Sequence, residues 1–90
     1  MKPTLKYVGL DVHQATTVAA VRDGQGRLLA RMVVPTEEAS LLEFVGTMPG
    51  AVHVAVEEGT QAQWVHDLLR PHVARVIVCD RRGLRRAPGS

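Results

Sequence analysis

The chain has 90 residues, of which 46% are hydrophobic and 22% are charged, and its formal net charge is +2. A chain of this length forms one small domain with a modest core, and its charged fraction excludes a largely disordered protein. Its single cysteine, Cys79, excludes an internal disulfide and suits a reducing compartment. The sequence shows neither a signal-peptide core nor the ~20 apolar residues of a membrane helix, so we expect a cytoplasmic protein.

The first third of the chain predicts three β-strands. Residues 6–12 are rich in strand-forming side chains, and a second such run, residues 16–21, follows after three residues. That gap is too short for a helical crossover, so the two runs should be antiparallel neighbours. Residues 23–26, Asp-Gly-Gln-Gly, predict a turn, and residues 28–34 then predict a third strand. We therefore expect a three-stranded meander.

A helix and a further strand are expected next. Thr36 suits the N-cap position of a helix, with Glu37 and Glu38 in the first turn, where carboxylates favour the helix dipole. Apolar residues then recur at helical spacing, at Leu41, Leu42, Val45 and Met48. After a Pro-Gly pair, valines alternate with alanine or histidine over residues 51–56, which predicts a largely buried strand.

The last two expected elements are a second helix and a fifth strand. Thr60 and Gln63 have the spacing of a T-x-x-Q capping box. An apolar stripe follows, formed by Ala62, Val65, Leu68 and Leu69. The helix should end near Arg70, before a proline, and residues 73–79 predict the last strand. The expected order is β-β-β-α-β-α-β, an α/β domain with a mixed sheet and right-handed crossovers after the meander.

The composition changes after residue 80, where the strand and helix periodicity stops. We therefore divide the chain into a folded domain, residues 1–80, and an irregular basic tail, residues 81–90. Four arginines of the tail are candidates for contact with a nucleic-acid backbone, namely Arg81, Arg82, Arg85 and Arg86. A basic run of this kind is also typical of a solvated chain end, and this alternative stays open.

Two acids stand where predicted strands end. Asp11 follows the apolar residues of the first strand and Glu57 follows those of the fourth, directly before Glu58. Carboxylates are the ligands that Mg²⁺ or Mn²⁺ prefers, so the pair indicates one split metal site. Each acid also suits a structural role, Asp11 as the cap of a turn and Glu57, like Glu58, as a favourable charge near a helix N-terminus.

Three segments together carry a resemblance to a known family. They are residues 9–13 (Gly-Leu-Asp-Val-His), the strand-turn-strand around Asp23 and Gly24, and residues 54–60 leading to Trp64. In order and spacing they resemble the N-terminal, RuvC-like domain of DEDD-type transposases of the insertion sequence 110 family. The resemblance implies an RNase H-like fold and DNA transposition, in which a recombinase cleaves and joins the DNA of a mobile element with magnesium. It also implies an element-encoded guide RNA as a partner, and we expect a homo-oligomer.

The resemblance matches Asp11 to the first of the family's four metal-binding acids and Glu57 to the second, which implies a catalytic role for both. The other two acids belong to a D-x-x-D segment, whereas Asp80 is followed three positions later by Gly83. The family's serine-bearing C-terminal domain also has no counterpart in these residues. Because two metal ions ~3.5–4 Å apart need more than two carboxylates, we expect the chain alone to cleave DNA weakly or not at all.

Two other functions stay open. The hairpin over residues 8–21 is similar to the phosphate-binding opening of sugar kinases and actin-like ATPases, but His13 and Gln14 stand where that hairpin needs glycine. The other alternative involves no catalysis. In it the chain folds, pairs with itself or with a full-length transposase, and at most binds nucleic acid through salt-sensitive contacts.

Overall fold

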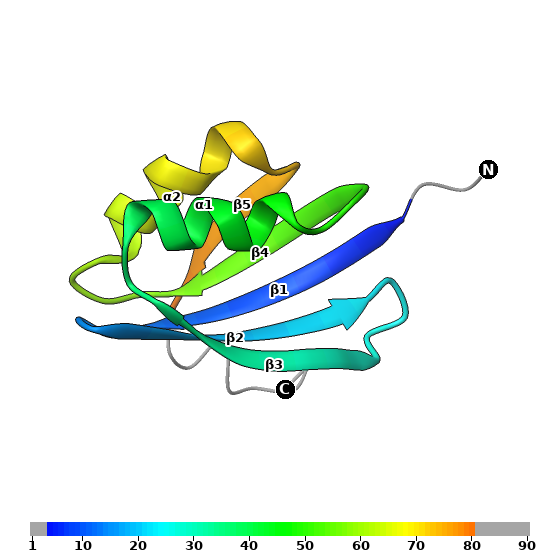
Figure 1. Cartoon of the computed structure of the whole chain (residues 1–90), viewed down its shortest axis with the longest axis horizontal. Coiled ribbons are helices and arrows are strands. Elements are labelled where there is room, and N and C mark those ends of the chain that lie inside the picture. The colour runs from blue at the N-terminus through cyan, green and yellow to red at the C-terminus, as the bar shows by residue number, and fades with distance from the viewer. Residues whose placement is uncertain (1–3, 81–90) are drawn as a thin grey trace.

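The computed structural model describes residues 4–80 (Figure 1). The elements in chain order are β1 (Leu5–Val12), β2 (Thr16–Asp23), β3 (Leu28–Pro35), α1 (Glu38–Gly46), β4 (Ala51–Glu57), α2 (Ala62–Leu69), η1 (Arg70–His72) and β5 (Arg75–Cys79). The α/β class, the five strands and the two helices of the sequence prediction are confirmed. The order differs from the expected one by η1, a short 3-10 helix with a proline in its first turn.

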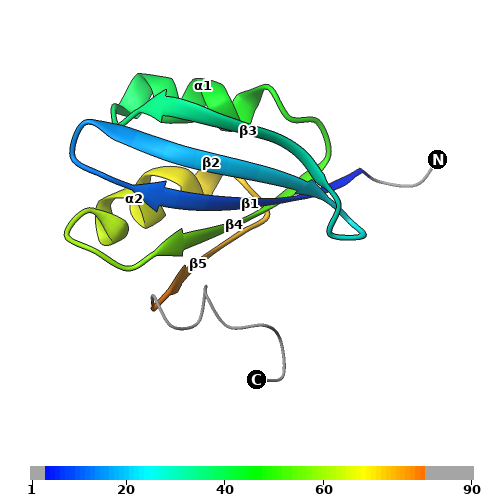
Figure 2. The same ribbon diagram turned by 90° about the horizontal axis from the view of Figure 1, so that it is seen from below.

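The five strands form one mixed sheet in the order β3-β2-β1-β4-β5 (Figure 2). β2 pairs antiparallel with both β1 and β3, which confirms the expected meander. β4 pairs parallel with β1 on one side and with β5 on the other. The carboxyl ends of β1, β4 and β5 therefore meet at one edge of the sheet.

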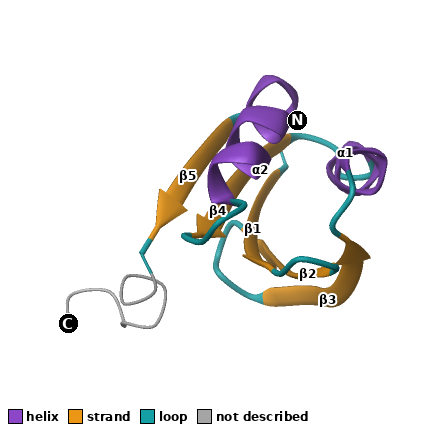
Figure 3. Ribbon diagram, turned by 90° about the vertical axis from the view of Figure 1, so that its left-hand side faces the viewer, coloured by secondary structure: helices purple, strands orange, loops and turns teal. Residues whose placement is uncertain are grey.

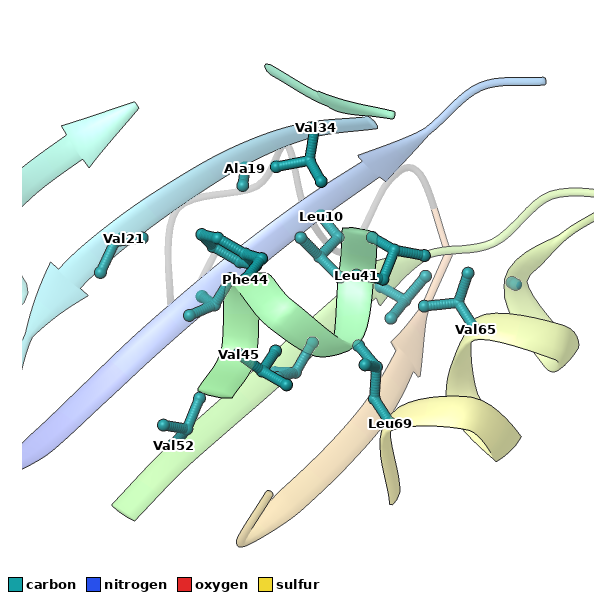
Figure 4. Close-up of a cluster of buried hydrophobic side chains, with 14 residues drawn as sticks. Leu10, Ala19, Val21, Val34, Leu41, Phe44, Val45, Val52, Val65 and Leu69 are labelled. Atoms are coloured by element: carbon teal, nitrogen blue, oxygen red, sulfur yellow. The ribbon is translucent and has the colours of Figure 1, made fainter. Parts of the chain in front are cut away.

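Both helices lie on one face of the sheet, which we call the helix face (Figure 3). Successive strand residues point to opposite faces, and on β4 the buried residues alternate with half-buried ones. The buried residues of β1, β2 and β4 point to the helix face and meet the apolar stripes of the helices (Figure 4). α1 contributes Leu41, Phe44 and Val45 to this core, and α2 contributes Ala62, Val65 and Leu69. The opposite face, which we call the open face, is covered by neither helix.

The start of α1 differs from the sequence prediction. Its N-cap is Glu37 rather than Thr36, and within the described chain it makes no side-chain cap hydrogen bond. The Thr36 hydroxyl instead donates to the carbonyl oxygen of His13 at 2.8 Å and lies 2.9 Å from the hydroxyl of the buried Thr17. The hydroxyl that was expected to cap the helix therefore fastens the β1–β2 turn to the end of β3.

The predicted capping box of α2 is also wrong. The helix begins at Ala62 with Gln61 at the N-cap, and in this part of the chain no side chain caps it. Thr60 therefore lies in the turn before the helix. The Gln63 side-chain amide donates to the carboxylate of Asp67 at 2.9 Å, one helical turn ahead.

Candidate metal site and the open face of the sheet

The structure brings Asp11 and Glu57 together on the open face. The parallel register pairs Gly9 with Ala55 and Leu10 with Val56, so that the two acids are the next residues along their strands. Leu10 and Val56 point to the helix face and are buried, so the two acids point the other way. Neighbouring strands are about 4.8 Å apart, which lets both carboxylates reach one small ion. The two acids therefore occupy neighbouring positions on adjacent strands, and their shared metal site stays a prediction.

Both acids line one shallow hollow of about 190 Å³. It is also lined by Gly9, which has no side chain, by Ala20, which has a small one, and by Arg31 from β3. Arg31 therefore contributes a positive charge to the rim that holds the two acids. Glu58 and Asp80, the other acids near these strand ends, do not line this hollow.

The β1–β2 turn holds the end of β1 in place. The His13 amide donates to the carbonyl of Thr16 at 2.9 Å, and the Thr36 amide donates to the carbonyl of Ala15 at 3.0 Å. Together with the Thr36 hydroxyl, these bonds connect the turn to β3. Asp11 therefore lies near the end of β1, two residues before His13, which lies in a turn that these hydrogen bonds connect to β3.

The electrostatic environment of Asp11 is that of a solvated carboxylate. About half of its side chain is exposed, and its Oδ1 lies 3.7 Å from Nε2 of His13, which is exposed to a similar degree. This contact is an ion pair only when His13 is protonated, and solvent screens it. Asp11 thus keeps the hydration and accessibility that a metal ligand at the surface needs.

The donor set fits a single hard cation bound mainly by water. Mg²⁺ is commonly bound by one or two carboxylates, with water or substrate oxygens completing the octahedron. Over residues 4–80, no three or more histidine, cysteine, aspartate or glutamate side chains are placed to bind one metal together. Asp11 and Glu57 are therefore a partial ligand set, with room for one ion.

The four arginines predicted to contact nucleic acid, Arg81, Arg82, Arg85 and Arg86, lie outside the described residues. Trp64, to which the third of the resembling segments leads, lies on α2 with 38% of its surface exposed and is not part of the buried core. Cys79 is half-buried at the end of β5, opposite Glu57 in the register. Neither helix of residues 4–80 has both the length and the apolar character needed to cross a bilayer.

Sequence reasoning missed a row of basic and aromatic side chains across the open face. The register aligns Arg22, Tyr7, His53 and Arg75 on four neighbouring strands, and we call them the basic row. The rings of Tyr7 and His53 pack edge to face, with centroids 5.5 Å apart. All four residues line a hollow of about 550 Å³. The sequence contains no local signal for this row, because its members come together only through the strand register.

No family model and no curated protein matches the chain. Among solved structures, the chain is similar to Pelota of Archaeoglobus fulgidus, with 19% sequence identity and a TM-score of 0.49. The match covers 92% of this chain and spans 29% of the length of that one. A likeness of this degree assigns neither a fold family nor a function.

Proposed function

We propose that this domain is the RNase H-like, N-terminal part of a DEDD-type DNA transposase of the insertion sequence 110 family, with Asp11 and Glu57 as its share of the metal site. One observation carries the proposal. Two acids that stand far apart in the sequence end neighbouring parallel strands and line the same hollow on the same face. The mixed sheet with an N-terminal meander, which the strand pattern predicted, agrees with this proposal.

The roles follow from the chemistry of the acids. Asp11 and Glu57 hold a divalent cation, and His13 lies close enough to Asp11 to orient a water molecule beside it. When bound, such an ion stabilises the charge of a phosphodiester oxygen and activates water. Because a second ion needs further ligands, the chain alone is not expected to cleave or join DNA.

The metal site is tested by titrating the ¹⁵N-labelled chain with Mn²⁺ and recording amide line broadening by NMR. Paramagnetic broadening should begin at the ends of β1 and β4 and should be lost in Asp11→Asn and Glu57→Gln. Asp67→Asn, which removes an exposed acid on α2, is the matched control and should leave the pattern unchanged. Broadening that is equally strong without Asp11 would overturn the assignment.

DNA cleavage provides a second test. The chain should not nick supercoiled DNA above background with Mg²⁺ or Mn²⁺ present. Turnover that depends on the metal and vanishes in Asp11→Asn would mean that two carboxylates suffice, against the argument above. DNA binding that weakens with salt and ignores Asp11→Asn, combined with no Mn²⁺ site, would favour a non-catalytic binding domain.

The phosphate-binding hairpin of kinases and actin-like ATPases has less support. In residues 4–80, a positive φ occurs only at Gly26 and Gly50, and both lie outside the β1–β2 turn. That turn therefore lacks the glycine conformation that lets a backbone approach phosphate closely.

A further inference from the structure

A shallow trough crosses the middle of the open face. Ala20, Gly9 and Ala55 are aligned by the register on β2, β1 and β4, and we call these three residues the trough. Arg31 stands at one end of this line and Ile77 at the other. Gly9 lines the two hollows described above, so the space beside the acids and the space above the basic row meet there.

The fold does not require a glycine at position 9. Its φ is not positive, and a Cβ built on it would meet no atom within 4 Å. A glycine in the interior of a strand lowers stability, by roughly 0.5–1 kcal/mol relative to alanine. Glycine at such a place often marks the close approach of a ligand or another backbone. The missing side chain is therefore an indication, independent of the charges, that something approaches the sheet at Gly9.

The charged side chains beside the trough indicate which kind of ligand approaches it. The basic row lies two residues from the trough along the strands, at a distance of roughly 6–7 Å, and it places Arg22 and Arg75 at its ends. Three strand spacings separate these arginines, which is about 14 Å. Between them Tyr7 is 41% exposed and packs against His53. Two cations that flank an aromatic pair beside a small-residue floor complement phosphates that flank an unstacked base.

We propose that the open face binds a single DNA strand, with a base over Gly9 against Tyr7 and with the flanking phosphates on Arg22 and Arg75. The inference takes its ligand from the proposed function, but it concerns a different set of residues. Such a strand would run beside the hollow that contains Asp11 and Glu57. The surface is thus a platform that presents DNA to the metal site, and it needs no metal to bind.

The test is the fluorescence anisotropy of a short labelled single-stranded DNA oligonucleotide, titrated with the 90-residue chain in EDTA. Gly9→Val fills the trough without altering any charge and should weaken binding about tenfold, the size expected for one lost stacked base. Gly46→Val is the matched control, because a Cβ added at Gly46 also meets open space but lies on α1. It should bind like the unchanged chain.

The phosphate contacts are tested by the salt dependence of the same binding. Each phosphate contact to a single strand contributes a slope of about −0.7 in log K against log salt, so Arg22→Gln with Arg75→Gln should reduce the slope by about 1.4. Arg70→Gln is the control, because it removes an exposed arginine next to α2 and should not affect how the DNA strand stacks on the open face. Its slope should stay that of the parent.

Four results would overturn this inference. One is full affinity in Gly9→Val with a folded chain, verified by circular dichroism, which would place the DNA elsewhere, for example on the basic tail. A second is an affinity for duplex DNA equal to that for single-stranded DNA, because a duplex does not offer an unstacked base. A third is a dimer that Gly9→Val dissociates without a change in DNA binding, which would make a second copy the occupant. A fourth is absence of DNA binding by the unchanged chain with an intact Mn²⁺ site, which would refute the platform and leave the metal proposal standing.

Discussion

At the scale of single residues, the Thr17–Thr36 pair shows how a buried hydroxyl depends on its partner. Thr36 donates its only hydroxyl hydrogen to the carbonyl of His13, so the buried Thr17 must donate to Thr36. Thr36→Val leaves the Thr17 hydroxyl without an acceptor and should lower the free energy of unfolding by about 1–3 kcal/mol. Thr17→Val removes the buried donor itself and should cost less. Urea denaturation of both variants measures the difference.

A double-mutant cycle then checks this assignment. With both threonines replaced by valine, no buried hydroxyl is left unsatisfied, so the loss should be smaller than the sum of the two single losses. Additive losses would show that the hydroxyls do not depend on each other. Ser40→Ala is a suitable control, because its hydroxyl bonds an exposed carboxylate at 3.4 Å.

A second residue-scale prediction concerns Asp23 in the β2–β3 turn. The amides of Arg27 and Gln25 donate to its carboxylate at 3.0 and 2.9 Å and hold the pKa of Asp23 below its usual value. A lowered pKa in the folded state means that this stabilisation is present above the unfolded pKa and is lost as the pH falls through the folded one. Asp23→Asn, which keeps an acceptor oxygen, should therefore flatten the acid side of the stability–pH curve. Urea midpoints between neutral and acidic pH measure it.

At the scale of elements, the strands could be predicted from the sequence and the helix caps could not. The alternation of valines over β4 follows from burial on one side, which is a local pattern. The use of Thr36 depends on His13 and Thr17, which reach it only after β1, β2 and β3 have paired. A hydroxyl with a tertiary partner gives no local sign that it is unavailable for capping.

The candidate site was predictable only in part, because some of its residues follow a local sequence pattern and others depend on strand pairing. Asp11 and Glu57 end apolar runs, which the sequence displays, and the parallel pairing of β1 with β4 then makes them neighbours. The basic row needs the register of four strands, and a shift of one residue would send a whole strand's side chains to the other face. Arg22 and Arg75 could therefore not be paired with Tyr7 before the register was known.

The edge strand β3 yields a prediction about self-association. It is eight residues long, and Leu28, Leu29 and Val33 are 49%, 50% and 64% exposed. A long apolar edge can pair with the same edge of another copy, whereas a lysine on it opposes such pairing. Val33→Lys should reduce self-association at high protein concentration and change the unfolding free energy by no more than about 0.5 kcal/mol. Light scattering and urea denaturation measure the two effects.

The neighbouring Val34 supplies the control for this prediction. It is buried at 7% exposure on the helix face, so Val34→Lys should destabilise the whole domain. Unchanged self-association in Val33→Lys would exclude the β3 edge as the contact. The expectation of a homo-oligomer would then require another surface.

At the scale of the whole molecule, the stability of the domain should depend on one face of the sheet. Val54 on the helix face is 2% exposed, whereas Ile77 on the open face is 42% exposed. Val54→Ala should cost roughly 2–3 kcal/mol through lost burial and a cavity, a large part of the 5–15 kcal/mol typical of a domain. Ile77→Ala removes more carbon but less buried surface, and should cost less than about 1 kcal/mol.

Urea midpoints of both variants, recorded at low and high protein concentration, test this asymmetry. In the isolated domain the cost of Ile77→Ala should be small and should not vary with concentration, because neither helix covers that side chain. A cost that rises with concentration would mean that a second copy buries the open face, since binding to the folded state adds stability by mass action. A cost equal to that of Val54→Ala even in dilute solution would contradict the one-sided core.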